Sequence, residues 1–591
     1  MIFFRLKPAL RKDFSPSMSN TYARVFNQNV RYSLHMELID VFKPTEHLKN
    51  QLLLPGDFFL PFGGKLNENN RWVQLAQLVP WEHAEKNYGR FFKNTFRGQQ
   101  TLSLRKGLGA LIIQERMQLT DRETVESISE NPYMQYFIGL SGFEQKPPFH
   151  HSMMTHFRKR LKDVLAELNE IIATEGVKEA QDDNDDDANH GSGSKQAQSD
   201  KKDDSSQSVA QQQTLFSSAH EPASSSETVS ADLQEQQRTS ETRNTREADA
   251  VTCTSTEALP DNQSQLATKN EGSLLLDATC APADIAYPTD LNLLSEAREK
   301  LEAIIDTLHK PVIGQVAKPR TYREVARRQY LAVSKQRRPG PKVIRKAIRR
   351  QLGFVGRNLA IIAEQAKTQS LALLGRKAYR DLLVIQELYR QQLHMYQTRS
   401  HQVEDRIVSI HQPHVRPIVR GKARTRVEFG AKIAVSMTKG YAYLERLSWD
   451  NFNESTTLIE AVEQYQSRFG CYPAVVQADQ IYRTRENRKY CKQHGIRLSG
   501  PALGRPPKEG PTPAQKQITK HDAGERNAIE GKFGEGKRKY GLGCIRARLE
   551  QTSESVITLQ LLVMNLERRL RVLFWLIFVF LFRGRPSPRF S

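Results

Sequence analysis

The sequence RNAIEGKFGEGKRKY, residues 526–540, is the stretch around which the rest of this chain is interpreted. Read as a helix that advances about 100° per residue, it places Arg526, Glu530 and Lys537 within about 40° of one face. Glu535 falls near the opposite side of the same helix. One acid therefore shares a stripe with two cations. A surface salt-bridge ladder has the same appearance, and each glycine in the stretch weakens a helix by about 1 kcal/mol relative to Ala.

Two aspartates elsewhere in the chain end apolar, strand-like runs. Residues 273–279 (SLLLDAT) predict a buried strand that presents Asp277 at a sheet edge, and residues 472–479 (YPAVVQAD) predict another that ends in Asp479. An ordinary aspartate that caps a turn is the alternative for each. Together with Glu530 they are candidate oxygen ligands for Mg²⁺ or Mn²⁺, and a pair of such ions can support phosphoryl transfer. The chain has 66 acidic residues, so spacing alone leaves their convergence open.

The charge of the chain is unevenly distributed along its 591 residues, a length that predicts two or more domains. The formal net charge is +21. Residues 181–270 hold 17 acidic and 7 basic residues, a charge of −10, so the remainder carries 21 + 10 = +31. A folded part this basic favours a polyanionic partner, with nucleic acid the leading candidate. A protein that is merely soluble and basic is the alternative.

Cysteines and termini indicate the compartment. The five cysteines are scattered and form no CxxC pair, which disfavours a disulfide framework or zinc ribbon and fits a reducing cytosol. Residues 1–12 lack the pattern of a signal peptide. The apolar run 572–582 is shorter than the about 20 residues of a membrane span. We expect no stable membrane span but a core or interface helix there, with peripheral membrane contact as the alternative.

The first half of the chain divides by composition. Residues 1–70 form an N-terminal extension, and residues 71–170 are predicted to form a helical DNA-binding domain, with a capping-box spacing at Thr120 and Glu123 and a basic end at 158–160. Residues 175–270 are rich in Asp, Ser, Gln and Thr. Because so little apolar surface is available there to offset ordering entropy, we predict a disordered acidic linker.

Residues 272–570 are predicted to form an α/β domain with a helical basic insertion over 310–400, followed by an apolar tail over 571–591. Residues 318–357 hold 14 Lys or Arg and a single acid. Arg345, Lys346, Arg349 and Arg350 cluster on one predicted helix, which favours contact with a DNA backbone over a merely solvated face. Strands are predicted over 406–410, 427–437, 441–447 and 496–499, and helices over 291–308, 455–469, 484–494 and 554–582.

Several long motifs of the chain also match a known family. They are VPW at 79–81, ENPYMQYF at 130–137, DATCAP at 277–282, YPTD at 287–290, QP at 412–413, RPIVRGK at 416–422, EFGAK at 428–432, ADQIYRTREN at 478–487, and the stretch 526–542. In these segments the chain resembles the DDE transposases of bacterial insertion sequences, in the group with an N-terminal helical domain and a split catalytic domain. The similarity runs over roughly 70–165 and 272–570.

The resemblance implies a ribonuclease-H-like mixed sheet with a helical insertion, preceded by an all-α domain. The disordered acidic linker between them is predicted from composition. The resemblance also implies that Asp277, Asp479 and Glu530 are the metal-binding catalytic triad, with Mg²⁺ or Mn²⁺ as cofactor. Relatives carry Tyr-x₂-Arg-x₃-Glu-x₆-Lys around the glutamate; Arg526, Glu530 and Lys537 fit this spacing, whereas Ala523 occupies the Tyr position. Arg526 and Lys537 are then expected to face DNA phosphates.

The implied function is a transposase that binds the ends of an insertion sequence and performs metal-dependent cleavage and strand transfer. Its partners would be double-stranded DNA and a second copy of the chain, in a prokaryotic cytoplasm in association with the nucleoid. The sequence itself leaves two alternative functions open. One is a metal-dependent DNA nuclease without strand transfer, and the other is an inactive derivative that only binds DNA.

Overall fold

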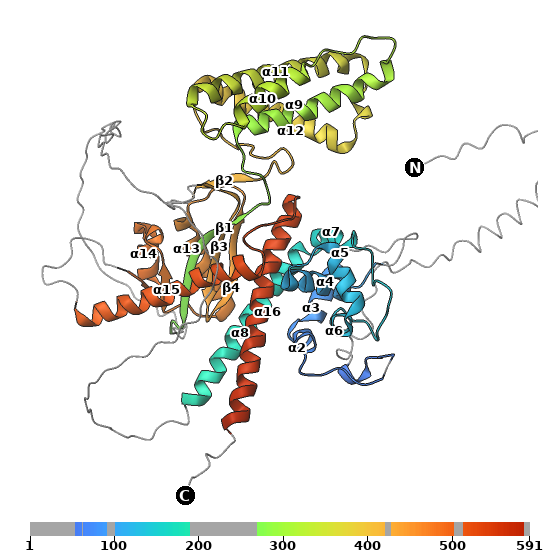
Figure 1. The fold of residues 1–591 in the computed structure, drawn as a ribbon. Helices are drawn as coiled ribbons and strands as arrows, with labels where there is room; N and C mark the ends of the chain where they lie inside the picture. Colours follow the sequence, from blue (N-terminus) through green and yellow to red (C-terminus); the bar gives the residue numbers. More distant parts are fainter. Residues whose placement is uncertain are drawn as a thin grey trace, which may run out of the picture. The chain divides into compact units, whose positions relative to one another are not determined.

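The computed structural model describes residues 54–61, 63–90, 101–188, 269–419, 427–500 and 512–583 (Figure 1). Apart from the last two residues of one helix, these belong to one compact unit, Met1–Asp186 with Thr268–Ser591. Most of the predicted N-terminal extension, most of the acidic linker and the last residues of the predicted tail lie outside the described residues. The described part is a mixed α/β structure with a helical N-terminal region.

The N-terminal region is helical, as predicted. After the short η3 (Pro55–Asp57) it contains α2 (Arg71–Leu78), α3 (Trp81–Gly89), α4 (Leu104–Met117), α5 (Asp121–Glu130), α6 (Pro132–Phe137), α7 (Met153–Arg160) and α8 (Lys162–Ala188). The predicted capping box is confirmed at α5: the Glu123 amide donates to the Thr120 hydroxyl and the Thr120 amide donates to the Glu123 carboxylate. Two orphan amides at the start of this helix are thereby satisfied.

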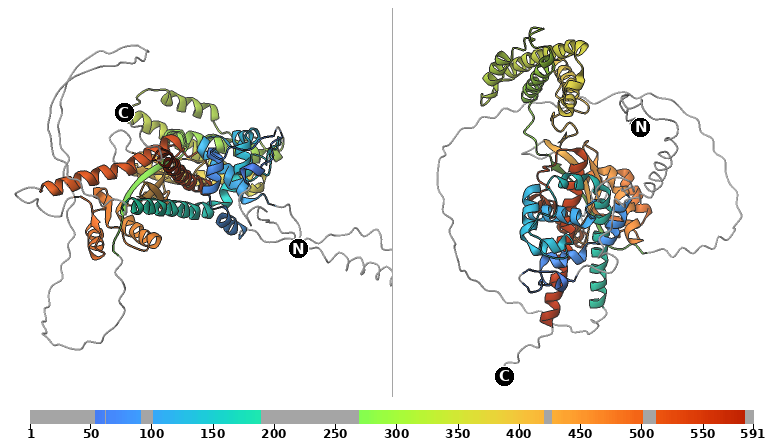
Figure 2. Two further views of the ribbon diagram at one scale, coloured as in Figure 1. Left: turned by 90° about the horizontal axis from the view of Figure 1, so that it is seen from below. Right: turned by 90° about the vertical axis from the view of Figure 1, so that its right-hand side faces the viewer.

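Helix α8 continues past residue 175, where the linker was predicted to begin. Val177 packs with Tyr441 and Tyr443 of the sheet, and Arg569 forms an ion pair of 2.8 Å with Glu175. Figures 1 and 2 show α8 beside α16 (Glu550–Arg583), the helix that carries Arg569. Tertiary contacts therefore order a polar segment whose composition alone predicted disorder.

A six-stranded mixed sheet forms the centre of the C-terminal half. Its strands are β1 (Ser273–Pro282), β2 (Arg416–Val419), β3 (Val427–Thr438), β4 (Tyr441–Ser448), β5 (Val475–Ala478) and β6 (Arg497–Leu498). The order is β2-β3-β1-β5-β6, with β4 also paired to β3. β3 runs antiparallel to β1, β2 and β4, whereas β5 runs parallel to both β1 and β6.

Two strand predictions are wrong in detail. Residues 406–410 form no strand, because Ile407 and Ile410 are buried among insertion helices and the Ile407 amide donates to the side chain of Gln391 at 2.9 Å. Asp277 does not end its strand: β1 continues to Pro282, because residues 277–282 pair with β3 after the pairing with β5 has stopped at Leu276.

The alternation of side chains along β1 separates two cores. Leu274 and Leu276 pack with α13 (Thr457–Phe469) and α14 (Arg485–Gln493), and Leu275 belongs to the core on the other face. That second core also contains residues of α15 (Pro513–Lys539), α16 and the N-terminal helices. Burial on both faces explains the continuous apolar run at 274–276. The predicted helix at 526–540 is confirmed as the C-terminal half of α15, which begins at Pro513.

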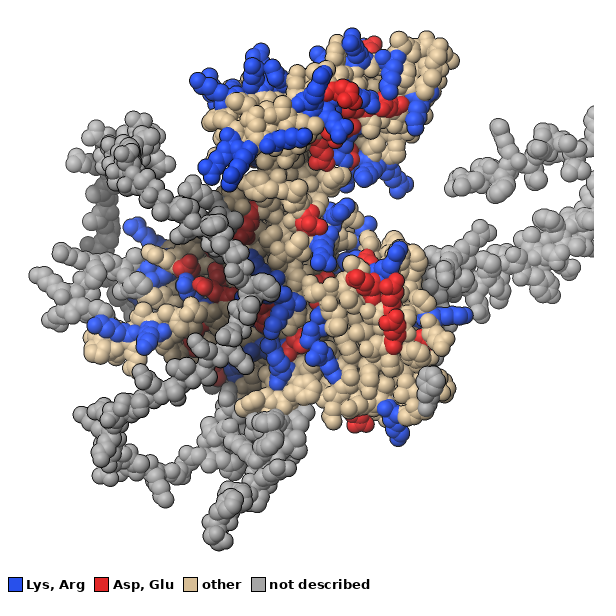
Figure 3. Space-filling model, viewed as in Figure 1, with Lys and Arg blue, Asp and Glu red and all other residues tan. Residues whose placement is uncertain are grey.

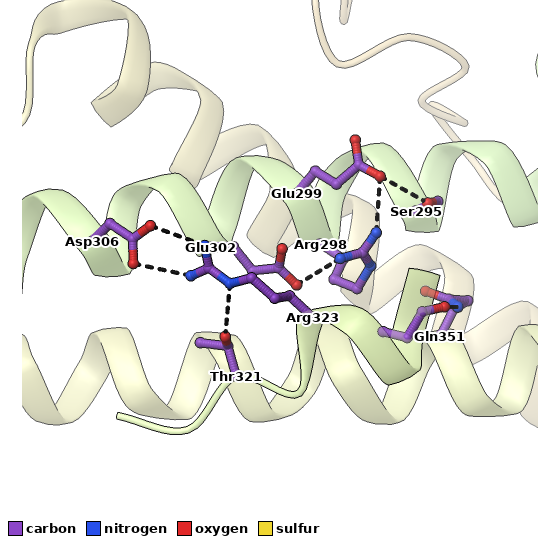
Figure 4. Close-up of polar contacts among 9 residues, drawn as sticks. Ser295, Arg298, Glu299, Glu302, Asp306, Thr321, Arg323 and Gln351 are labelled. Atoms are coloured by element: carbon purple, nitrogen blue, oxygen red, sulfur yellow. Dashed lines mark hydrogen bonds and ion pairs between the residues drawn. The ribbon is translucent and has the colours of Figure 1, made fainter. Parts of the chain in front are cut away.

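A helical insertion separates β1 from β2. It consists of α9 (Asp290–His309), α10 (Arg323–Ser334), α11 (Pro341–Thr368) and α12 (Arg376–Thr398), with the short η4 (Lys310–Val312) and η5 (Leu371–Leu373). These helices enclose a core of their own. Figure 4 shows how α10 is tied to α9: Arg323 donates to both carboxylate oxygens of Asp306, at 3.0 and 3.1 Å. The buried Arg298 donates to Glu302 at 2.6 Å in the same network.

Helix α16 contains the apolar run that was predicted to be a core or interface helix. It begins at Glu550, close to the predicted start, and its residues Ile557, Leu561 and Val563 are buried in the core shared with the N-terminal helices. Phe574 and Trp575, further along, are exposed. Among the described residues, none of the helices combines the length and the apolar composition needed to cross a bilayer.

Two helix-interior glycines provide a matched test of the contact between α8 and β4. A Cβ at Gly353 of α11 meets nothing within 4 Å, whereas a Cβ at Gly176 of α8 would clash with the hydroxyl end of the Tyr441 ring. We expect Gly353→Ala to raise the free energy of unfolding by about 0.5–1 kcal/mol. Gly176→Ala should lower it by about 1–3 kcal/mol. Urea unfolding measures both, and equal effects of the two substitutions would contradict the docking of α8 on the sheet.

Candidate active site

The pairing of β1 with β5 brings the two predicted aspartates together. The two strands are parallel and Leu276 lies opposite Ala478, so the next residue along each strand is an aspartate. β5 ends there, and Asp479 leaves the sheet as the N-cap of η7 (Gln480–Tyr482), where its Oδ1 accepts from the Gln480 amide at 2.7 Å. Asp277 remains within β1, opposite Val435 of β3. The register therefore places these two residues side by side, which spacing in the sequence had left open, although Asp277 lies within its strand.

Side-chain alternation determines which face the two aspartates occupy. Successive side chains of a strand point to opposite faces, so Asp277 shares a face with Leu275, away from Leu274 and Leu276. Likewise Asp479 shares a face with Gln477, whose amide donates to Glu525 of α15. Both aspartates therefore point toward the layer that contains α15.

Helix α15 supplies the third acid. Ile529 and Phe533 of α15 are buried in the core, so the adjacent Glu530 lies at the margin of the packed face and its side chain is 59% exposed. A cavity of about 940 Å³ is lined by Asp277, Asp479 and Glu530 together with Lys537. The structure thus gathers the three predicted acids and one of the two predicted cations around one cavity.

Arg526, the other cation of the stripe, lies between two of the acids. Its guanidinium donates to Asp479 Oδ1 at 2.9 Å and is 3.7 Å from Glu530 Oε1. In the structure the Arg526 side chain contacts carboxylates, and its expected contact with DNA phosphates stays a prediction. The predicted stripe is real, and Arg526 partly neutralises the acids that the sheet and helix bring together.

The electrostatics of the cavity centre on Asp277. Burial is the largest cause that raises its pKa, to about 6, with further increases from the negative charges of Glu454, Asp479 and Glu530. A hydrogen bond of 2.8 Å from the Ala278 amide to Oδ1 opposes the shift. A buried carboxyl beside three other acids is an environment that a cation would stabilise.

The donor chemistry of the triad fits a hard divalent cation. Its carboxylates are the ligands that Mg²⁺ and Mn²⁺ prefer. The carboxylate oxygens of these three residues do not, however, all lie within 4.8 Å of one another. Within the described ranges such a group exists instead at His521, Asp522 and Glu525. Its central member is already neutralised, because both oxygens of Asp522 accept from Arg497, at 2.6 and 2.9 Å.

Two residues of the cavity were not found from the sequence. Glu454 and Lys432 line it with the triad, and the Lys432 ammonium lies 3.0 Å from Glu454 Oε1. Glu454 begins η6 (Glu454–Thr456), just before α13. An acid at the start of a helix is common for reasons of helix polarity alone. The sequence therefore contains no local signal that separates Glu454 from other acids.

The predicted cations of the insertion all lie on α11, in two different environments. Arg345 stacks on the ring of Tyr396, 4.1 Å from its centroid, and donates to the Tyr396 carbonyl at 2.9 Å. Lys346, Arg349 and Arg350 are exposed and line a groove of about 380 Å³ together with Arg357 of α11 and Gln329 of α10. Figure 3 shows Lys and Arg side chains over the surface of the insertion. The structure groups three of the four predicted cations in one groove.

Comparison with known proteins gives two family matches. Residues 61–160, which contain α2 to α7, match the family described as Transposase domain (DUF772). Residues 476–567, which contain Asp479, Glu530 and α15, match the family described as Transposase DDE domain. Both matched families are transposase families, and together the two matches cover about a third of the chain, which is consistent with a DDE transposase.

A relative is known from Rhizobium meliloti under the name "Uncharacterized protein ORF8 in nfe locus". It is 34% identical to this chain over 96 residues, which are 16% of this chain and 45% of the relative. The chain thus spans less than half the length of this relative. No solved structure matches the chain.

The negative charge of Asp277 is predicted to lower the free energy of unfolding of the protein. Because folding raises the pKa of Asp277 from 3.8 to about 6, its ionisation above pH 6 lowers the free energy of unfolding, by about 1.4 kcal/mol per pKa unit. We expect Asp277→Asn to raise the free energy of unfolding at pH 7.5, without divalent ions, by about 1–3 kcal/mol.

This gain should shrink as the pH falls from 6 to 4, because the wild-type carboxyl is then protonated in the folded protein. Urea unfolding at several pH values measures it. Asp479→Asn is the control, since the Asp479 side chain is 58% exposed and pairs with Arg526, and its effect should be small. An Asp277→Asn variant that is no more stable than wild type at pH 7.5 would contradict the raised pKa that we assign to Asp277.

Proposed function

We propose that this protein is an insertion-sequence transposase that binds the ends of its element and carries out metal-dependent DNA cleavage and strand transfer. The observation that carries the proposal is the parallel register that makes Asp277 and Asp479 neighbours on the face toward Glu530 of α15. The strand order, with an antiparallel β3 and a parallel β5 on either side of β1, supports a ribonuclease-H-like fold.

In the proposed function Asp277, Asp479 and Glu530 hold Mg²⁺ or Mn²⁺. When bound, such ions activate an attacking oxygen and stabilise the leaving oxygen of a phosphodiester. The attacking oxygen belongs first to water, which frees a DNA 3′-hydroxyl, and then to that hydroxyl, which attacks target DNA. A P–O bond forms as another breaks in each step, so neither step requires a covalent link to the protein.

The cations of the site admit DNA to an acidic cavity. Four carboxyl groups line it, those of Asp277, Glu454, Asp479 and Glu530, and without compensation they would repel a phosphate backbone. Lys432 and Lys537 line the same cavity, and Arg526 pairs with Asp479. We assign Arg526 and Lys537 to the DNA phosphates near the scissile bond, a role that charge-assisted hydrogen bonds suit.

DNA contacts away from the cavity are assigned to the insertion. Lys346, Arg349 and Arg350 line an exposed groove with no acid among its lining residues, which fits a phosphate backbone. Arg345 is proposed to support them by fixing α11 against Tyr396. The N-terminal helices are proposed to bind the element ends. A homodimer on paired ends, in the bacterial cytoplasm at the nucleoid, completes the proposal.

The triad can be tested by substitution that preserves shape. We expect Asp277→Asn, Asp479→Asn and Glu530→Gln each to reduce Mg²⁺-dependent cleavage of labelled element-end DNA by more than about 100-fold, the upper end of what an outer-shell change costs. Binding of the same DNA should persist. Glu486→Gln, at an exposed acid of α14, is the control and should cleave normally. Cleavage without joining by the wild-type protein would favour a nuclease. Binding without cleavage would contradict the proposed enzymatic activity.

The insertion groove can be tested through the salt dependence of DNA binding. The triple variant Lys346→Ala, Arg349→Ala, Arg350→Ala should weaken binding and reduce the slope of log K against log salt by about 2–3, near 0.9 per lost phosphate contact. The control removes three exposed cations at the other end of α11 and the start of α12: Lys367, Arg376 and Lys377. At about 1.5 Å per residue these begin roughly 30 Å from Lys346, so the slope should change less. Equal slopes for both triple variants would contradict the proposed role of the groove in DNA binding.

A further inference from the structure

Lys432 holds together the turn that leads into the cavity from β4. It lies on β3 opposite Cys280 of β1 and Ser448 of β4, and only 7% of the residue is exposed. Its ammonium donates to the Phe452 carbonyl at 2.8 Å and to Asn451 Oδ1 at 3.2 Å, and it is 3.0 Å from Glu454 Oε1. Of the three donors of an ammonium, two are used in hydrogen bonds to residues 451 and 452, and Glu454 adds an ion pair.

This arrangement fixes Glu454 at the margin of the cavity. Asn453 caps η6 by accepting from the Ser455 amide at 3.2 Å, so the backbone around Glu454 is held from both sides. The Glu454 side chain is 23% exposed and lines the cavity with Asp277, Asp479 and Glu530. Its Oε1 is the carboxylate oxygen that lies nearest the Lys432 ammonium.

A structural ion pair is the simpler explanation, because a buried lysine needs an opposite charge. Two observations go beyond it. Lys432 already donates to a carbonyl and to an amide oxygen. The acid that neutralises its charge, Glu454, also lines the cavity that contains the triad.

The number of ligands points the same way. Mg²⁺ demands octahedral coordination by six oxygens, and a pair of ions sharing three carboxylates leaves most positions to water and DNA. A fourth carboxylate at the cavity, contributed by the connection between β4 and α13, would add a protein oxygen to this set.

We infer that Glu454 is a fourth acidic residue of the active site, which binds divalent metal with Asp277, Asp479 and Glu530, and that Lys432 positions it. The inference rests on the proposed function, since the triad is the metal site that Glu454 extends. In this arrangement Lys432 does not contact the metal; it fixes the rotamer of the Glu454 side chain through Oε1 and leaves Oε2 to the ion.

Metal binding by the full-length protein, measured by titration calorimetry with Mn²⁺ at pH 7.5 in the absence of DNA, tests this inference. Glu454→Gln keeps an oxygen that can accept from Lys432 but removes the charge, and we expect it to weaken Mn²⁺ binding about 10–100-fold. Glu454→Asp keeps the charge on a shorter side chain and should fall between wild type and Glu454→Gln. Glu460→Gln, at an exposed acid of α13, should bind Mn²⁺ as wild type does.

Asp479→Asn separates failure of the inference from failure of the proposed function. If Asp479→Asn loses Mn²⁺ affinity while both Glu454 variants bind as wild type, Glu454 is only the structural partner of Lys432 and the inference is overturned. If Asp479→Asn also binds as wild type, the metal site of the proposed function is itself wrong. Thermal unfolding without metal shows whether each variant is folded, and the Glu454→Asp variant retains the test if Glu454→Gln does not fold.

Discussion

The parallel pairing of β1 with β5 is the constraint on which the rest of this structure depends. Leu276 lies opposite Ala478, and Leu274, Leu276 and Val476 are buried in the core against α13. Because a shift of one residue would turn these side chains out of the core, hydrophobic burial determines the register. The same register makes the next residues, Asp277 and Asp479, neighbours on the opposite face. The apolar side of two short strands thus positions the polar residues of the site.

Helix α15 completes the site through packing that its glycines permit. In sequence the glycines only weaken the helix, but at Gly536 a Cβ would come within 3.1 Å of Met564 Sδ and 3.2 Å of Leu542. A larger residue there would push α15 away from α16. Ile529 and Phe533 then anchor α15 in the core shared with β1, so the position of Glu530 follows from a close helix contact elsewhere on the same helix.

Local patterns predicted much of this arrangement, and long-range pairing explains what they missed. The stripe of Arg526, Glu530 and Lys537 depends only on helical periodicity, and the apolar strands at 273–276 and 475–478 only on composition. The continuation of β1 beyond Asp277 depends on β3, about 150 residues away. The order in α8 beyond residue 175 depends on Tyr441 and Arg569. Glu454 lines the cavity and pairs with Lys432 of β3, and no window of sequence around Glu454 could reveal either contact.

The charges of the cavity and of the insertion imply a division of labour in the proposed function. Within the described residues the cavity sets four carboxyl groups against Lys432, Lys537 and Arg526, and this near balance provides little long-range attraction for DNA. The insertion carries 14 Lys or Arg between residues 318 and 357 with one acid, on helices that enclose their own core. Because phosphate contacts supply most non-specific affinity, binding energy can come from the insertion while the acidic cavity stays suited to metal. In the proposed function, placing the basic residues on the insertion rather than at the cavity lets the chain attract a polyanion without neutralising the carboxylates proposed to bind metal.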